Sequence, residues 1–125
     1  MVCSALICAQ SVVIDKATNR ASLLNITENI NSTLFPIQYP MCIFMMYERQ
    51  ENEDGNYELL LNVNIDGQEI LKTPFKINFI DGNLRNNSTI NISGLIIPKT
   101  GKLTFAIYFK GEELRSTYIN VKEKI

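Results

Sequence analysis

The sequence predicts an all-β domain built as an antiparallel sandwich. Its apolar residues recur at every second position in several segments, most clearly over residues 57–65 and 103–109, and this period is typical of half-buried strands. Turn residues interrupt the chain about every 8–12 residues, and no segment has the periodicity of a helix. Together these patterns favour about eight strands in an immunoglobulin-like or C2-like sandwich, with a barrel as the lesser alternative.

The expected strands surround one central element, residues 41–47, which is an unbroken apolar run that follows Pro40. A run this short predicts a strand with both faces covered. Residues 29–40 are expected to be a crossing loop, because Pro36 and Pro40 cannot donate to a ladder. The other expected strands lie within residues 1–14, 22–28, 57–65, 68–79, 89–97, 103–109 and 114–121.

Two short motifs predict local geometry within these strands. Asp66-Gly67 is a preferred pair for a tight hairpin turn with positive φ angles. Pro74 marks an edge strand or a bulge. Residues 1–14 are apolar, but the first positive charge is Lys16, so they are expected to form an ordinary first strand and not a secretory signal.

Length and charge limit the possible partners. A chain of 125 residues, 46% hydrophobic and 20% charged, is expected to fold as a single β-sandwich domain spanning residues 1–125. The net charge of −1 provides no field that would attract nucleic acid. No apolar run approaches the roughly 20 residues of a membrane-spanning helix, so we expect a soluble protein with neither nucleic acid nor membrane as partner.

Cysteine and asparagine give opposing hints about compartment. Cys3 and Cys8 are expected to point to opposite faces of one strand, which excludes a disulfide between them, and with Cys42 they indicate a reducing cytoplasm. Against this stand Asn-x-Ser/Thr triplets, which would be glycosylated in a secreted protein. The triplets begin at Asn25, Asn31, Asn86, Asn87 and Asn91.

The chain contains no histidine, and this absence bears on catalysis. Catalytic triads, Cys–His pairs and most zinc sites depend on an imidazole. Every aspartate lies in a predicted turn, which accounts for it without chemistry. We therefore expect no enzyme, no catalytic residues and no cofactor.

Carboxylates gathered at one end of the sandwich offer a calcium hypothesis. The 51–56 turn and the 81–87 loop are expected to share an end with residues 110–112, which would bring Asp54, Asp81 and Glu112 together, with Glu51 and Glu53 nearby. The alternative is that these are solvated hairpin tips, which the lack of any single-loop calcium spacing favours.

Two further groups have both a structural and a functional interpretation. Met41, Phe44 and Met46 form either an adaptable contact surface or part of a core strand, and the core interpretation is favoured. A second set of strand asparagines could present amides to sugar hydroxyls, although compositional bias explains them more simply. This set comprises Asn62, Asn64, Asn78, Asn91 and Asn120.

The order of these features resembles a family of small, uncharacterised bacterial β-sandwich proteins. The residues that carry the resemblance are Asp15, Arg20–Ile26, Phe35-Pro36, Ile65-Asp66-Gly67, Pro98-Lys99-Thr100-Gly101 and Ile119-Asn120-Val121. Related sequences often carry an acidic residue after an early cysteine, where this chain has Cys8-Ala9-Gln10. The resemblance implies a β-sandwich in a bacterial cytoplasm and brings no activity or site residues.

The sequence therefore predicts a non-catalytic binding domain whose partner is another protein. A homodimer through a strand edge or through the methionine-bearing strand is one form of this hypothesis. The alternative function is an accessory factor that binds a small ligand or calcium at the acidic loop end.

Overall fold

The computed structural model describes residues 1–124, which form nine strands and one short 3-10 turn. The strands are β1 (Val2–Ile14), β2 (Ala21–Ile26), β3 (Asn29–Ser32), β4 (Ile37–Glu48), β5 (Asn56–Ile65), β6 (Gln68–Asn78), β7 (Arg85–Ile97), β8 (Gly101–Phe109) and β9 (Glu112–Glu123), and η1 (Ile80–Gly82) precedes β7. Within residues 1–124 no helix has the length and apolar character that would let it cross a membrane.

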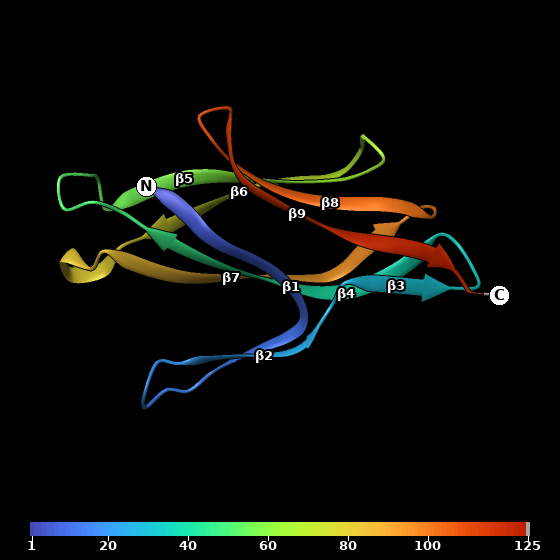
Figure 1. Cartoon of the computed structure of the whole chain (residues 1–125), viewed down its shortest axis with the longest axis horizontal. Coiled ribbons are helices and arrows are strands. Elements are labelled where there is room, and N and C mark those ends of the chain that lie inside the picture. The colour runs from blue at the N-terminus through green and yellow to red at the C-terminus, as the bar shows by residue number, and fades with distance from the viewer. Residues whose placement is uncertain (125) are drawn as a thin grey trace.

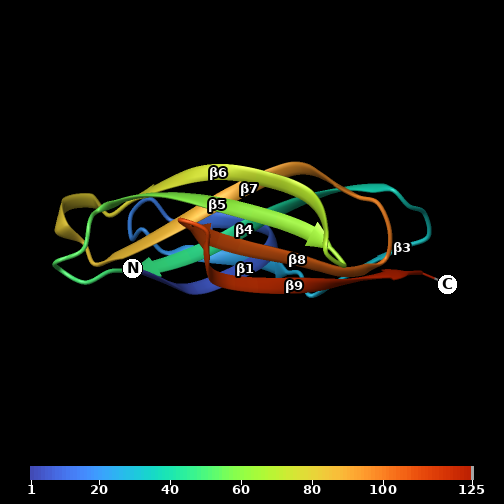
Figure 2. The same ribbon diagram turned by 90° about the horizontal axis from the view of Figure 1, so that it is seen from above.

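The strands form two facing sheets, as Figures 1 and 2 show. The first sheet has the order β2-β1-β4-β7, and the second has the order β3-β9-β8-β5-β6. Without β2 and β3, these orders correspond to strands A-B-E and G-F-C-C′ of an immunoglobulin sandwich. The predicted sandwich is confirmed, with nine strands in place of about eight, and one pair, β3 with β9, is parallel.

β4 supplies the centre of the core, as its apolar run predicts. It lies between β1 and β7, and its inward-facing residues Met41, Ile43, Met45 and Tyr47 are at most 2% exposed. On the outer face Phe44 is also buried. The four inward-facing residues pack into one apolar cluster with residues of the second sheet.

The prediction of a loop over residues 29–40 is wrong at both ends. Residues 29–32 form β3 beside β9, where Ile30 is buried in the core, and β4 begins at Ile37. Pro40 is tolerated inside β4 because the register with β7 shifts between Tyr39 and Met41, so the regular ladder is interrupted there.

Other local predictions are confirmed. Asp66 and Gly67 have φ angles of 45° and 86°, the positive pair that a tight hairpin turn requires. Pro74 lies in β6, which is an edge strand of the second sheet. β7 begins at Arg85, four residues before the expected start at Thr89.

A bulge in β1 overturns the prediction that Cys3 and Cys8 point to opposite faces, although no disulfide joins them, as expected. The register of β1 with β4 shifts between Cys3 and Ala5, so that Cys3 pairs with Tyr47 and Cys8 pairs with Ile43. Both cysteines therefore face the core instead of opposite sides, and both are buried and unpaired. At the bulge β1 carries one residue more than β4, and beyond such an extra residue the alternation of inward and outward side chains is reversed.

Candidate functional site

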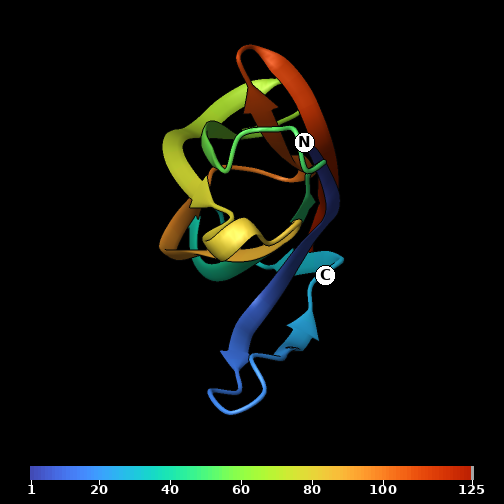
Figure 3. The same cartoon turned by 90° about the vertical axis from the view of Figure 1, so that its left-hand side faces the viewer.

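β1 is longer than the sheet to which it belongs, and this produces the first candidate surface. Its pairing with β4 ends at Ala9, and from there to Ile14 it pairs with β2 alone. Residues 9–14 and 21–26, with the turn 15–20, form a two-stranded extension that we call the ribbon. Figures 1 and 3 show it projecting from the body of the sandwich on the outer side of the first sheet.

The register of the ribbon places its apolar residues on particular faces. Ala9 pairs with Ile26, Ser11 with Leu24, and Val13 with Ser22. Paired residues share a face, and alternate residues of β1 lie on the same side. Val13, Leu24 and Ile26 therefore form one surface, which we call the apolar face, and they are 53%, 49% and 56% exposed.

The turn that closes the ribbon is held by Asp15. Its carboxylate Oδ1 accepts the backbone N–H of Ala17 at 2.8 Å, and its main chain bonds to Asn19 and Arg20. Asn19 has a φ of 57°, a conformation that asparagine tolerates. These bonds order the turn that joins β1 to β2, so they hold the two strands that carry the apolar face in a fixed arrangement.

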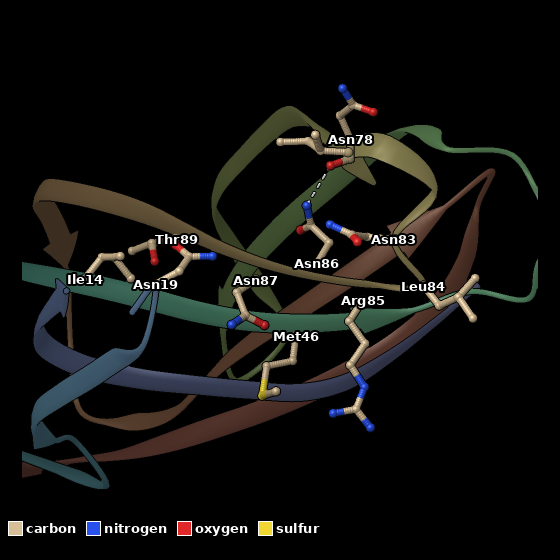
Figure 4. Close-up of a pocket in the computed structure, with 11 residues that line it drawn as sticks. Ile14, Asn19, Met46, Asn78, Asn83, Leu84, Arg85, Asn86, Asn87 and Thr89 are labelled. Carbon is tan, nitrogen blue, oxygen red and sulfur yellow. Dashed lines mark hydrogen bonds between the residues drawn. The ribbon is translucent and has the colours of Figure 1, made fainter. Parts of the chain in front are cut away.

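A cleft of about 800 Å³ lies between the ribbon and the β7 side of the first sheet, and we call it the amide cleft (Figure 4). Ile14 and Asn19 of the ribbon line one side, and Met46 belongs to the outer face of β4. The remaining lining comes from β6, η1, the two residues that follow η1, and β7. These residues are Asn78, Ile80, Asn83, Leu84, Arg85, Asn86, Asn87 and Thr89.

The cleft combines one hydrogen-bonded amide with several that have no partner among residues 1–124. The side chain of Asn86 donates to the carbonyl of Asn78 at 2.8 Å and accepts from the Ser88 hydroxyl, which ties β7 to the end of β6 (Figure 4). The side chains of Asn19, Asn83 and Asn87 make no hydrogen bond to any of residues 1–124. Such amides can both donate to and accept from a ligand.

The arrangement of the charged residues in and near the cleft is also defined. Arg85 Nη2 lies 3.2 Å from Glu48 Oε1, and both side chains are well exposed. Arg85 is the one ionisable residue among those that line the cleft. Glu48 borders the cleft beside Arg85, and no carboxylate is among the lining residues, so the lining holds no pair of carboxylates for acid–base chemistry.

The carboxylates of the calcium hypothesis do not form a cluster in the part of the chain that the structure describes. Asp54, Asp81 and Glu112 are all exposed, and among residues 1–124 no group of three or more acidic, cysteine or histidine side chains is placed to hold a metal ion. The 110–111 turn belongs to the second sheet and projects away from η1 (Figure 1). Sharing an end of the sandwich does not bring the side chains together.

Glu53 of the neighbouring loop is engaged within the protein. Its carboxylate contacts the Met1 ammonium group and accepts the backbone N–H of Gln50. These hydrogen bonds lower the pKa of the Glu53 carboxyl below its ordinary value. Arg49 completes this cluster by donating to the Glu53 carbonyl and by lying over the ring of Phe79.

The three predicted interaction residues separate into core and surface. Met41 and Phe44 are 2% and 4% exposed and cannot contact a partner, since β4 is covered at these positions. Met46 is partly exposed and lines the amide cleft. Of the asparagines considered as a sugar-binding ladder, Asn78 alone lines this cleft, so the structure does not assemble that ladder.

Comparison with known proteins identifies the family to which the chain belongs. Residues 4–122 match the family described as "Family of unknown function (DUF6941)". The chain belongs to this family. No curated protein matches the DUF6941 chain. A solved structure that it resembles is an immunoglobulin-like protein from Pseudomonas aeruginosa, with 15% sequence identity, a TM-score of 0.42, and coverage of 96% of this chain and 94% of that one.

The buried titratable groups of the DUF6941 chain are structural. Burial raises the pKa of the Cys8 thiol to about 12, and it also raises the pKa values of Cys3 and of the Tyr47 hydroxyl. A raised pKa keeps a thiol protonated and therefore unreactive. Neither buried cysteine is suited to nucleophilic chemistry.

Sequence reasoning placed strands within residues 1–14 and 22–28, which form the ribbon of the DUF6941 chain, but it missed their projection beyond the sheet and it missed the amide cleft. One signal was available for the ribbon, because Val12, Val13 and Ile14 are apolar on both faces immediately before a polar turn. The cleft joins residues far apart in the sequence, such as Asn19 and Asn87, and no local pattern indicates that they meet.

Proposed function

We propose that this protein is a non-catalytic interaction domain that binds another protein through the apolar face of the ribbon. The observation that carries the proposal is the shared exposure of Val13, Leu24 and Ile26 on one side of a projecting two-stranded element. Single exposed apolar residues are common on proteins, whereas neighbouring ones on a projection are typical of contact surfaces.

The position of the ribbon supports this proposal. β2 is the edge strand of the first sheet, and beyond Ala9 the ribbon has no third strand beside it. A partner can therefore approach the apolar face without displacing any other strand of the first sheet. The ordered turn at Asp15 reduces the entropy that would be lost when the face is bound.

The residue composition and the burial of the thiols support a role without catalysis. The chain has no histidine, and the thiols of Cys3 and Cys8 are buried with raised pKa values. The unpaired state of the cysteines also supports the proposal that the protein acts in a reducing compartment. The alternative of a calcium-binding factor loses its supporting cluster, because the loop carboxylates do not converge.

Site-specific photocrosslinking in the native host tests the proposal. A benzophenone amino acid replaces Ser22, which is exposed and pairs with Val13, so the anchors themselves are retained. The matched control places the same group at Ser116, an exposed serine of β9 in the second sheet. We expect a protein adduct from position 22 and none of the same mass from position 116.

The decisive comparison adds V13T/L24T/I26T to the position 22 protein. Threonine keeps the β-propensity while removing apolar surface, so the adduct should disappear from a folded variant. With the purified partner, the triple substitution should raise Kd roughly 100-fold, as expected when central anchors are truncated. An adduct between two copies of the chain would identify the partner as a second copy. An adduct that survives the triple substitution would contradict the proposal.

A further inference from the structure

We infer that the amide cleft is a second binding site and that its ligand is an extended peptide segment, which adds as a strand to the free edge of β7. This site uses different residues from the apolar face of the ribbon and does not depend on binding there. Its ligand class follows from the edge strand, the amides and the charge of the lining.

The edge of β7 supplies unpaired main chain inside the cleft. β7 is the last strand of the first sheet and pairs with β4 alone. Arg85, Asn86, Asn87 and Thr89 all belong to this strand and line the cleft. A free strand edge offers backbone donors and acceptors, and proteins use such edges to bind extended peptides.

The side chains along β7 have the spacing of a peptide strand. Arg85, Asn87 and Thr89 pair with Glu48, Met46 and Phe44, so they share the outer face of the sheet. Alternate residues of a strand lie about 6.8 Å apart, which is also the two-residue repeat of an extended ligand. A peptide that adds at the edge would therefore place alternate side chains beside this row of amide and hydroxyl groups.

The amides match peptide groups chemically. Asn87 lies on β7, Asn19 lies on the ribbon, and Asn83 lies beside η1 (Figure 4). The side chains of all three are free of hydrogen bonds to residues 1–124, and each offers an NH₂ donor and a carbonyl acceptor. A peptide backbone needs both kinds of partner at each residue.

The apolar and charged residues of the lining restrict the kinds of peptide that the cleft can bind. Ile14, Ile80 and Leu84 line the cleft and are 45%, 60% and 39% exposed, so they can receive apolar side chains of the peptide. Arg85 is the charged residue of the lining, and Glu48 Oε1 lies 3.2 Å from its Nη2, so the two charges balance. A cleft without net charge favours an uncharged segment over a charged one. The cleft volume of about 800 Å³ is in the range of ligand sites.

The experiment selects peptides from a phage-displayed library of random dodecapeptides on the immobilised full chain. The recovered peptides are synthesised with a fluorophore, and Kd is measured by anisotropy. We expect N87L/T89V to raise Kd about tenfold or more, because it removes two polar partners from the row. The matched control is N120L, which removes an exposed asparagine from β9 of the other sheet and should change Kd less than about twofold.

Two further measurements keep the inference testable if N87L/T89V folds poorly. Asn19→Gly removes an amide from the opposite wall at a position whose φ of 57° glycine adopts freely, and it should also weaken binding. Bound peptide should slow hydrogen exchange at backbone amides of residues 85–89, as strand addition requires. An equal affinity of both cleft variants and the original chain would overturn the inference.

Other results would overturn it in identifiable ways. Failure of the library to yield any peptide enriched over an unrelated immobilised β-sandwich would exclude a peptide ligand. Peptide binding that is lost in V13T/L24T/I26T but retained in N87L/T89V would assign the peptide to the ribbon, which supports the proposed function and overturns this inference. Binding of oligosaccharides, with loss in N87L/T89V and no peptide bound, would assign the cleft to sugars.

Discussion

The triple substitution V13T/L24T/I26T should leave the fold stable, because these side chains contribute little to the core. Full burial of such a side chain stabilises a protein by about 1.5–3 kcal/mol, and each of these is only about half buried. Threonine retains part of the contact, so we expect a loss of about 0.5 kcal/mol per site and about 1.5 kcal/mol in total. In contrast, Ile43→Ala removes a fully buried side chain and should alone reduce the free energy of unfolding by about 2–5 kcal/mol.

Equilibrium urea unfolding, followed by far-UV circular dichroism, distinguishes these expectations. The chain has no tryptophan, so tyrosine fluorescence serves as the second signal for a two-state transition. The triple variant should unfold at a higher urea concentration than Ile43→Ala, with an unchanged m-value. If the triple variant is instead as unstable as Ile43→Ala, the apolar residues of the ribbon belong to the core, and their exposure gives no argument for a partner.

Three further predictions concern single positions. Because hydrogen bonds lower the pKa of Glu53 in the folded state, its contribution to stability is present above its ordinary pKa of 4.5 and is lost as the pH falls through the folded value. Glu53→Gln should therefore unfold earlier than the original chain at neutral pH but not at strongly acidic pH, and a gap that is independent of pH would contradict this. Gly101 has a φ of 142°, and an added Cβ would lie 2.3 Å from Asp66 Oδ2. Gly101→Ala should thus destabilise the fold by at least about 1 kcal/mol in urea, and an unchanged midpoint would refute the argument. Because burial raises the pKa of Cys8 to about 12, iodoacetamide should label this residue only in denaturant, whereas labelling of the native protein detected by mass spectrometry would count against a closed core.

Local sequence patterns were sufficient for most of the sandwich. β5 and β8 are visible in the sequence because burial on one face requires apolar residues at alternate positions. The Asp66-Gly67 turn is also visible, since few residues adopt positive φ without strain. These features depend on neighbours in the sequence and so leave a readable signal.

The features that were missed depend on distant parts of the chain. β3 is short and is held by a parallel pairing with β9, in which Ile30 is partnered by Val121. The bulge near Ser4 turns both Cys3 and Cys8 toward the core, yet no residue type at that position predicts it. The calcium hypothesis, which the sequence already disfavoured, lacks a cluster for a related reason, because turn residues specify where the chain reverses but not how far apart neighbouring turns lie.

Both proposed surfaces arise from one departure from the immunoglobulin order. In that order, the first strand turns directly into the strand that corresponds to β4. Here the chain between Ile14 and Ile37 instead forms β2, which extends the first sheet, and β3, which extends the second. β1 extends beyond the end of its pairing with β4 and pairs there with β2. The resulting ribbon exposes the apolar face and also supplies Ile14 and Asn19 to the amide cleft.

The stability of the sandwich does not require the apolar face of the ribbon. The core cluster is built from strands of both sheets, and the apolar face of the ribbon contributes none of its buried members. Three exposed apolar side chains on a projection also increase the risk of aggregation. An apolar face that adds this risk without contributing to the core is explained most directly by a partner that covers it. The binding measurement on V13T/L24T/I26T tests whether a partner contacts the face, and the unfolding measurement tests whether the face contributes to stability.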